Sequence, residues 1–131
     1  MRKDIEGQDD IRLLIDRFYE KVRDNDEIGY LFNEVAKVNW VSHLPVMYAF
    51  WEQILFGTGN YSGNPMKAHM KLNSLSPMKP EHFRAWVRLF HQNLDELFEG
   101  PVAELARQRA ASIATVMELK IVHGGIGHAK G

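Results

Sequence analysis

The 131-residue sequence contains no cysteine. This absence excludes disulfide bonds, thiolate zinc sites, iron–sulfur clusters, thiol catalysis and haem attached through a Cys-x-x-Cys-His sequence. Long apolar runs are also missing: none approaches the ~20 residues that span a bilayer, and the start, MRKDIEGQDD, lacks the apolar core of a signal peptide. A formal net charge of −1 gives no electrostatic reason to bind nucleic acid or an anionic membrane. We therefore expect a cytoplasmic protein with a small-molecule partner or none.

The composition is ordinary for a globular chain, with 45% hydrophobic and 25% charged residues. A chain of this length supports one hydrophobic core but not two. We predict a single domain over residues 1–131, with flexible tails at about 1–7 and 124–131.

Apolar residues recur at helical spacing, beginning with a predicted helix from Ile11 to Val22. Asp9 and Asp10 suit its start, both as caps and as favourable charges on the helix dipole. Its expected buried face consists of Ile11, Leu14, Ile15, Phe18, Tyr19 and Val22. Residues 24–27 break the pattern, and a short apolar connector follows, made of Ile28, Tyr30, Leu31 and Phe32.

Three further helices complete the predicted fold. One begins after Asn39 and is ended by Gly57 and Gly59. The others run over residues 80–98 and from 102 to about 122. Their expected apolar positions are Trp40, Leu44, Met47, Trp51, Ile54 and Leu55, then Phe83, Trp86, Phe90, Leu94 and Leu97, then Val102, Leu105, Ala106, Ile113, Val116 and Met117. The fold class is all-α.

Several chemistries of helical proteins are disfavoured by spacing. No glutamate has a histidine three residues later, as a di-iron bundle requires. No two histidines lie four residues apart, as in a helical zinc site. The glycine-rich FGTGNYSGN follows a predicted helix and lacks the Gly-Lys-Ser/Thr ending of a phosphate-binding loop, so we interpret it as a connector. By elimination, a bound planar cofactor is favoured over a protein-only active site.

Two histidines could serve such a cofactor. His43 lies among aromatic residues on a predicted helix, and His69 follows the glycine-rich loop and Pro65. A haem iron needs one imidazole as its ligand, while a second can meet whatever binds opposite. The spacing alone leaves open whether these are instead ordinary core or surface histidines. We interpret the remaining histidines as surface residues: His82, His91, His123 and His128.

The residues around these histidines resemble the third group of truncated haemoglobins. The shared motifs are His43-Leu44, Phe50-Trp51, Gly57-Thr58-Gly59, Asn64-Pro65-Met66 with His69, Phe18-Tyr19 with Val22, Phe32, Trp86 with Leu89-Phe90, and Gln108-Arg109-Ala110 with Ile113-Ala114. The resemblance runs from about Ile11 to Gly125. Other truncated groups carry glycine pairs between their early helices, whereas here Gly-Gly occurs only at Gly124-Gly125, which fits the third group.

The resemblance implies a truncated-globin fold, in which two helix pairs form a two-over-two sandwich that encloses a non-covalent haem b. It implies His69 as the iron ligand, and Tyr19, His43 and Trp86 on the opposite, distal side. The residues it implies around or beneath the porphyrin are Phe18, Phe32, Met47, Phe50, Trp51, Met66 and Met70. Candidate partners for the haem propionates, by position at the rim, are Tyr61, Lys67 and Lys71.

The distal trio implies firm binding of a polar diatomic ligand, which suits chemistry on that ligand better than oxygen transport. The resemblance favours nitric oxide dioxygenation to nitrate or a peroxidase-like reaction, with O2, NO, CO or peroxide as ligands. A separate electron donor or reductase would be required, and we expect a bacterial protein that is monomeric. Two alternatives remain: an O2 or NO scavenger or sensor without turnover, and a cofactor-free helical interaction domain whose aromatic residues are plain core.

Overall fold

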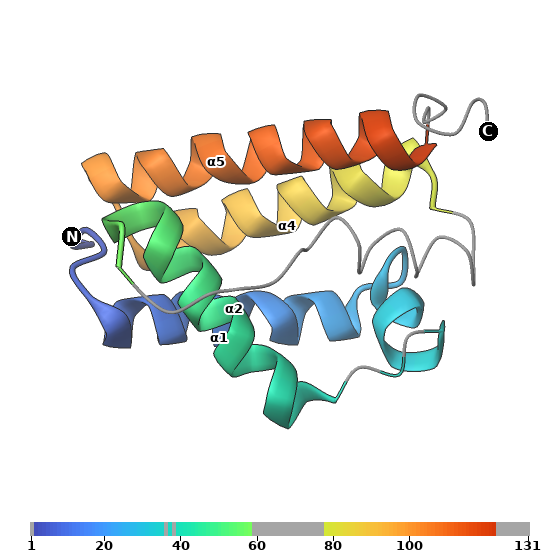
Figure 1. Cartoon of the computed structure of the whole chain (residues 1–131), viewed down its shortest axis with the longest axis horizontal. Helices are drawn as coiled ribbons and strands as arrows, with labels where there is room; N and C mark the ends of the chain where they lie inside the picture. The colour runs from blue at the N-terminus through green and yellow to red at the C-terminus, as the bar shows by residue number, and fades with distance from the viewer. Residues whose placement is uncertain (1, 36, 38, 59–77, 123–131) are drawn as a thin grey trace.

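The computed structural model describes residues 2–35, 37, 39–58 and 78–122. Its α-helices in these ranges are α1 (Gln8–Asp24), α2 (Trp40–Phe56), α4 (Pro80–Leu97) and α5 (Pro101–Met117), shown in Figure 1. A π-helical turn, η1 (Leu31–Val35), follows α1, and a second, η2 (Glu118–Val122), continues α5. None of the described residues is in a strand. The predicted all-α class is therefore confirmed.

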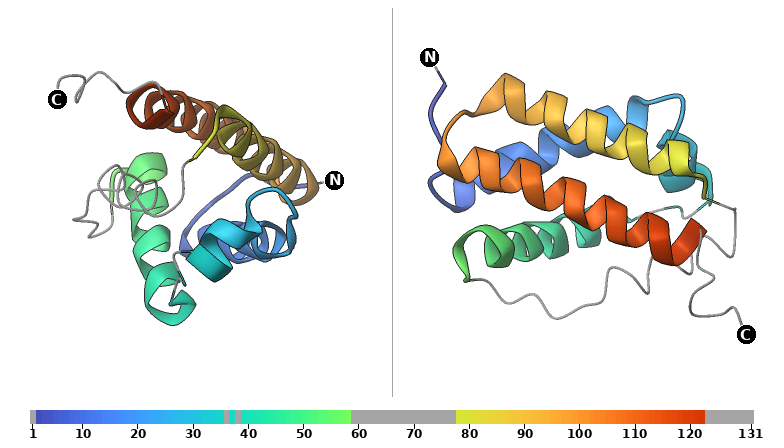
Figure 2. Two further views of the ribbon diagram at one scale, coloured as in Figure 1. Left: turned by 90° about the vertical axis from the view of Figure 1, so that its right-hand side faces the viewer. Right: turned by 90° about the horizontal axis from the view of Figure 1, so that it is seen from above.

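The helices form two layers. Helices α4 and α5 lie side by side in one layer, and α2 crosses α1 in the other (Figures 1 and 2). The layers meet where α1 packs against α4 and α2 against α5. This is the predicted arrangement of two crossed pairs, and it places the aromatic side chains of α1, α2 and α4 between the layers.

Helix α1 buries the face that its sequence predicts. All six expected residues are buried, and Leu14, Ile15 and Val22 have no exposed surface. The predicted capping by acidic residues is wrong: Gly7 is the N-cap and makes no side-chain cap hydrogen bond. Asp9 and Asp10 lie in the first turn, where their charges favour the helix dipole.

Helix α2 begins and ends as its sequence predicts. The side chain of Asn39 accepts hydrogen bonds from the backbone N–H groups of Val41 (3.1 Å) and Ser42 (3.4 Å), which otherwise lack partners in the first turn. At the other end Gly57 has φ 73°, a left-handed conformation that glycine adopts without a steric penalty. The bounds of α2 are therefore set by local sequence at both ends.

Helix α5 packs through small residues instead of the expected large ones. Its buried positions are Ala103, Ala106, Ala110, Ala114 and Met117. Val116, expected on the buried face, is 46% exposed. Because alanine ends at Cβ, a face of alanines allows the backbones of α4 and α5 to approach closely. The apolar pattern thus located the helix and two of its buried residues, Ala106 and Met117, but missed the other three alanines and wrongly included Val116.

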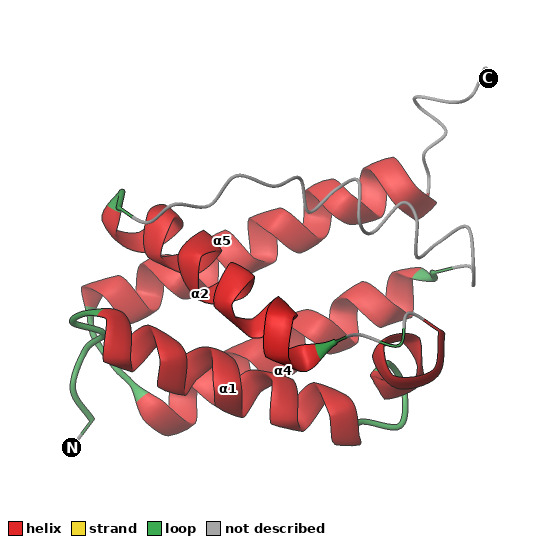
Figure 3. Cartoon of the chain, turned by 60° about the horizontal axis from the view of Figure 1, so that its bottom comes forward, coloured by secondary structure: helices red, strands yellow, loops and turns green. Residues whose placement is uncertain are grey.

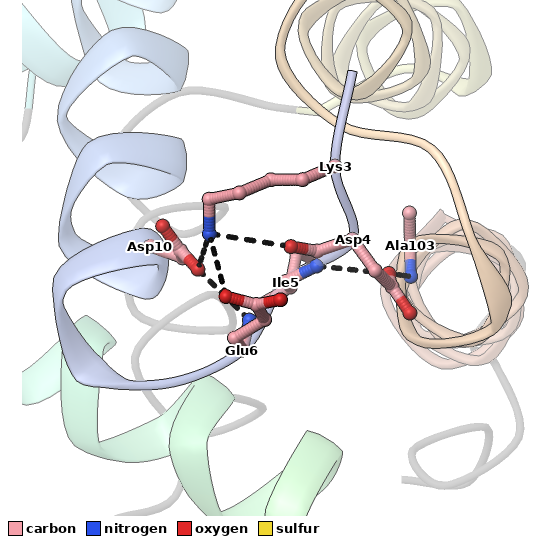
Figure 4. A network of polar contacts seen from close by, with 6 residues as sticks. All are labelled: Lys3, Asp4, Ile5, Glu6, Asp10 and Ala103. Atoms are coloured by element: carbon pink, nitrogen blue, oxygen red, sulfur yellow. Dashed lines mark hydrogen bonds and ion pairs between the residues drawn. The ribbon is translucent and has the colours of Figure 1, made fainter. Parts of the chain in front are cut away.

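The N-terminal residues are tied to the rest of the protein, whereas the sequence led us to expect a flexible tail over 1–7. Ile5 is 2% exposed and belongs to the core. The carboxylate of Asp4 accepts hydrogen bonds from the backbone N–H groups of Val102 (2.9 Å) and Ala103 (2.8 Å), so it caps α5 from outside (Figure 4). At Gly100 (φ 147°) any Cβ would come within 2.5 Å of the Asp4 side chain, so this approach requires glycine.

A second tie joins the same arm to the start of α1. Lys3 pairs with Asp10 and with Glu6, and Asp10 also accepts a hydrogen bond from the backbone N–H of Glu6 at 2.8 Å (Figure 4). These contacts link residues 3–10 to one another, while Asp4 links them to α5. The predicted tail at 124–131 lies outside the described residues.

Two histidines expected at the surface are half-buried and hydrogen-bonded. The ring of His82 accepts a hydrogen bond from the backbone N–H of Lys79 (3.0 Å), and its other nitrogen lies 3.3 Å from the Tyr30 hydroxyl. His91 bonds to the carbonyl of Arg107 at 3.1 Å. Burial, with the nearby charge of Lys79, lowers the pKa of His82. His123 and His128 lie outside the described residues.

Across the described ranges, the helices (red in Figure 3) are too short or too polar for any of them to cross a membrane.

Candidate functional site

Four ring-bearing side chains from three elements meet near the end of α1. We call Tyr19, Phe32, Trp40 and His43 the polar cluster, since three of them carry a polar ring atom or hydroxyl. The ring of Tyr19 lies 5.1 Å from Trp40, 5.7 Å from His43 and 6.1 Å from Phe32, measured between centroids. Trp40 and His43 are themselves 5.7 Å apart in an edge-to-face contact. The cluster therefore joins α1, η1 and the first turn of α2.

Local sequence explains how the cluster is assembled. Trp40 and His43 are three residues apart on α2, so their side chains share one helix face. The Asn39 cap fixes where that helix starts. Phe32 stacks on Trp40 with centroids 6.1 Å apart and planes 25° from parallel, which places η1 against the start of α2.

The hydroxyl of Tyr19 is the most unusual polar group in the cluster. The residue is only 6% exposed. Within the described ranges, no residue hydrogen-bonds to this hydroxyl; the side chain of Arg23 bonds instead to the carbonyl oxygen of Tyr19. Burial raises its pKa well above the ordinary value for tyrosine, so it keeps its proton. A tyrosine hydroxyl is both a donor and an acceptor, so this group is suited to donate a hydrogen bond to a ligand.

The third predicted distal residue, Trp86, is connected to the polar cluster through Phe18. Trp86 meets Phe18 edge-to-face at 5.5 Å, and Phe18 meets Tyr19 at 4.9 Å. Trp86 also stacks on Phe90, with centroids 5.7 Å apart and planes 16° from parallel. The structure thus brings Tyr19 and His43 into direct contact and places Trp86 one ring away.

The predicted wall residues of the first two helices divide into two kinds. Phe18 (1% exposed) and Trp51 (3%) are core residues, and Trp51 stacks on Phe90 at 4.9 Å. Together with Trp86, these rings form what we call the packed cluster: Phe18, Trp51, Trp86 and Phe90. Phe32, Met47 and Phe50 are half-buried and pack against the core. These last three therefore keep surface available for a bound group.

The predicted iron ligand, His69, lies outside the described residues. So do the other predicted contacts of that segment, namely Tyr61, Met66, Lys67, Met70 and Lys71. Within the ranges that are described, no group of three or more His, Asp or Glu side chains could hold a metal ion. The assignment of His69 as the iron ligand therefore stays a prediction.

Sequence reasoning missed two residues of this site. Trp40 was placed only among the apolar positions of α2, and Arg23 was not considered. The guanidinium carbon of Arg23 lies 5.0 Å from the centre of the Trp40 ring, in a cation–π contact. The three-residue spacing of Trp40 and His43 was the available signal for Trp40, because it puts both on one face. Nothing local signals Arg23, since its contact joins different helices.

Comparison with known proteins identifies the fold. A family model described as bacterial-like globin matches residues 3–121. The chain belongs to this family. It is 33% identical over 112 residues to a group 3 truncated hemoglobin of Campylobacter jejuni, covering 83% of this chain and 86% of that protein. The crystal structure of a group III truncated hemoglobin from the same organism matches with a TM-score of 0.80 and 31% identity, covering 92% of this globin and 95% of that chain.

The resemblance to the third group of truncated haemoglobins is thus confirmed, as is the truncated-globin fold. Membership of the globin family implies haem binding and the binding of small diatomic ligands. The described residues fit such a group, because half-buried aromatic walls stand beside a buried hydroxyl donor that lacks an acceptor among them.

Proposed function

We propose that this globin is a haem b protein that binds dioxygen and other diatomic ligands at a five-coordinate iron and performs redox chemistry on them. The reactions we infer are nitric oxide dioxygenation to nitrate and peroxidase-like activation of peroxide, rather than oxygen transport. The observation that carries this proposal is the Tyr19 hydroxyl, a protonated donor in a residue that is 6% exposed and makes no other side-chain hydrogen bond within the described ranges.

The haem would supply an iron that binds the small ligand and exchanges electrons with it. In this proposal His69 holds the iron, and Phe32, Met47 and Phe50 line the porphyrin. Each of these three side chains is half-buried and packs on the core, so each can add a wall without leaving a cavity behind it. Phe18 and Trp51 would not line the porphyrin directly but would fix the positions of the residues that do.

Tyr19 would donate a hydrogen bond from its hydroxyl to the ligand. Its raised pKa keeps that proton in place at neutral pH. One charge-assisted hydrogen bond of ~1.5 kcal/mol slows ligand loss by roughly tenfold. Slow ligand loss is unsuited to oxygen transport, which requires release. It favours a reaction, because a second reactant can arrive before the ligand dissociates.

Trp86 and His43 would complete the polar side. The indole N–H of Trp86 is a second donor, and stacking on Phe90 holds its ring in one orientation. Imidazole is a common proton carrier in enzymes, so His43 could supply the proton that a peroxidase-like reaction needs. Its place at the start of α2 also suits a gate that swings between Tyr19 and solvent.

The first test is the absorption spectrum of the purified protein, in the ferric state and after reduction with dithionite, with and without carbon monoxide. We expect a strong Soret band that shifts with carbon monoxide to a histidine-ligated ferrous form. His69→Ala should lose stable haem retention. A protein that is colourless and refuses added haemin would contradict the proposal at its root.

The second test separates turnover from simple capture. With an electron donor and oxygen present, we expect the protein to consume many equivalents of nitric oxide per haem and to release nitrate, or to consume peroxide repeatedly. Consumption that stops after one equivalent of either would contradict the proposed redox activity and identify a scavenger or sensor. Trp86→Phe should keep the haem and speed oxygen release, since it removes only the N–H donor.

A further inference from the structure

Arg23 holds the polar cluster together from outside. It lies in the last turn of α1, one turn after Tyr19, and its Nε donates a hydrogen bond to the Tyr19 carbonyl at 3.4 Å. Its guanidinium lies over the Trp40 ring at 5.0 Å. Its own carbonyl accepts a hydrogen bond from the side chain of Asn33 at 3.0 Å. One residue therefore connects α1, η1 and α2 at the point where the cluster forms.

The first turn of α2 depends on contacts with other elements to stay in place. The first N–H groups of a helix have no intrahelical acceptors, and helix ends fray. His43 lies in this first turn, and its backbone N–H makes the first intrahelical hydrogen bond of α2, to the carbonyl of Asn39 at 2.9 Å. The position of the His43 ring therefore depends on whatever fastens residues 40–43 to the rest of the protein.

Trp40 is well placed to hold residues 40–43 against the rest of the protein through its side chain. It is the first residue of α2, it is half-buried, and its ring touches both Tyr19 (5.1 Å) and His43 (5.7 Å). A displacement of this ring would change the surroundings of both polar groups together. The guanidinium of Arg23 also lies over this ring, 5.0 Å from its centre.

We propose that Arg23 and Trp40 are positioning residues of the polar cluster: Arg23 clamps Trp40 against Tyr19 and His43, and the clamp determines how firmly His43 is held in the cluster. Neither residue is assigned a contact with the ligand. The consequence for ligand binding rests on the proposed function, whereas the clamp itself does not. A cation in the last turn of α1 also favours the helix dipole, but that role would leave the mobility of His43 unchanged.

The chain provides a matched control for Arg23. Arg12, on the same helix, lies over the ring of Tyr48 on α2 at 5.6 Å. Arg23→Met and Arg12→Met each remove one positive charge and one cation–π contact between α1 and α2. Only Arg23 touches the polar cluster, so a difference between the two variants isolates the clamp from charge and from general helix pairing.

The decisive measurement is amide hydrogen exchange at His43 in the purified, haem-loaded protein. A lost cation–π contact corresponds to roughly a threefold to tenfold shift in a local opening equilibrium, so Arg23→Met should raise the exchange rate at His43 by that factor. Arg12→Met should leave it unchanged. Arg23→Lys keeps a cation over the ring and should restore most of the protection.

An exchange rate at His43 that does not rise in Arg23→Met, or that rises equally in Arg12→Met, would overturn the clamp. Should Arg23→Met fail to fold, Trp40→Leu removes the same contact from the other side and should give the same increase. Carbon monoxide rebinding after photolysis then tests the link to the ligand. Faster exchange with unchanged rebinding would support the clamp while counting against the proposed role of the polar cluster.

Discussion

Phe18 and Tyr19 are neighbours on α1, yet the clusters they belong to are built differently. The rings of the packed cluster stack and interlock, as in the contact of Trp51 with Phe90 at 4.9 Å and 19°. The polar cluster consists mostly of half-buried rings, and its buried member, Tyr19, has a hydroxyl with no acceptor among the described residues. Adjacent positions on one helix thus serve two purposes. The first cluster stabilises the fold, whereas we propose that the second provides hydrogen-bond donors to a bound ligand.

Asn93 is a buried polar residue whose side chain is hydrogen-bonded within the fold. It is buried beside the packed cluster with 0% of its surface exposed. Its side-chain N–H donates to the carbonyl of Leu14 at 2.8 Å, and its oxygen accepts from Lys21 at 3.3 Å. The amide of Asn93 thus has a partner on both its nitrogen and its oxygen, whereas no described residue bonds to the hydroxyl of Tyr19.

The largest expected effect lies in the packed cluster. Phe90 has 0% exposed surface and contacts Phe18, Trp51 and Trp86. Phe90→Ala should lower the free energy of unfolding by about 3–5 kcal/mol, because it leaves a cavity that three rings cannot fill. Urea unfolding followed by far-UV circular dichroism measures this.

The matched change in the polar cluster is Phe32→Ala. Its half-buried side chain should cost only about 1–2 kcal/mol, since less apolar surface is lost. Equal costs for Phe90→Ala and Phe32→Ala would remove the distinction between the clusters.

An effect smaller than that of Phe90→Ala is expected for the buried amide of Asn93. Asn93→Ala should lower the free energy of unfolding by about 1–3 kcal/mol, since it removes two hydrogen bonds and leaves a gap at a buried position. The exposed neighbour Gln92 is the control, and Gln92→Ala should stay within about 0.5 kcal/mol of the parent. If Asn93→Ala proved as stable as Gln92→Ala, the contrast with Tyr19 would lose its basis.

The smallest effect concerns the N-terminal arm. Burial opposes ionisation of Asp4, but hydrogen bonds from the backbone N–H groups of Val102, Ala103 and Ile5 outweigh it and lower the pKa of this carboxyl. Asp4→Ala should therefore cost about 1 kcal/mol at neutral pH, as the loss of a helix cap does. A lowered folded pKa means that this advantage is present above the unfolded value of 3.8 and is lost as pH falls through the folded value.

Unfolding of Asp4→Ala and the parent at pH 7 and under acidic conditions checks that sign. Asp9→Ala, a change at an exposed acid of the first turn of α1, controls for lost negative charge. An advantage of the parent that survives acidification undiminished would mean that the charge on Asp4 is not what caps α5.

The sequence predicted the helices better than their faces. Periodicity located α1 to within a few residues and identified all six of its buried side chains, because one helix face meets one core. On α5 it identified Ala106 and Met117 but missed the other three buried alanines, because alanine carries little hydrophobic signal. It also gave no sign that Asp4 caps α5, since that hydrogen bond joins residues 98 apart.

The candidate site divides in the same way. Tyr19 and His43 were predicted from motifs, and the structure places their rings in contact. Arg23 could not be found in this way, because a cation–π contact between helices leaves no pattern in either segment, whereas the spacing of Trp40 and His43 was a signal for Trp40 that was not used. Sequence motifs can therefore predict the residues that would contact a ligand, whereas the residues that position them depend on tertiary packing.

The central claim is that the Tyr19 hydroxyl serves a bound ligand and not the fold. The most direct test measures two quantities for Tyr19→Phe: its oxygen dissociation rate and its free energy of unfolding. The change removes one hydroxyl and keeps the ring contacts with Trp40 and His43. We predict that oxygen leaves roughly tenfold faster, while stability is unchanged or slightly increased. A dissociation rate equal to that of the parent, together with a clear loss of stability, would show that the hydroxyl serves the fold and would contradict the account.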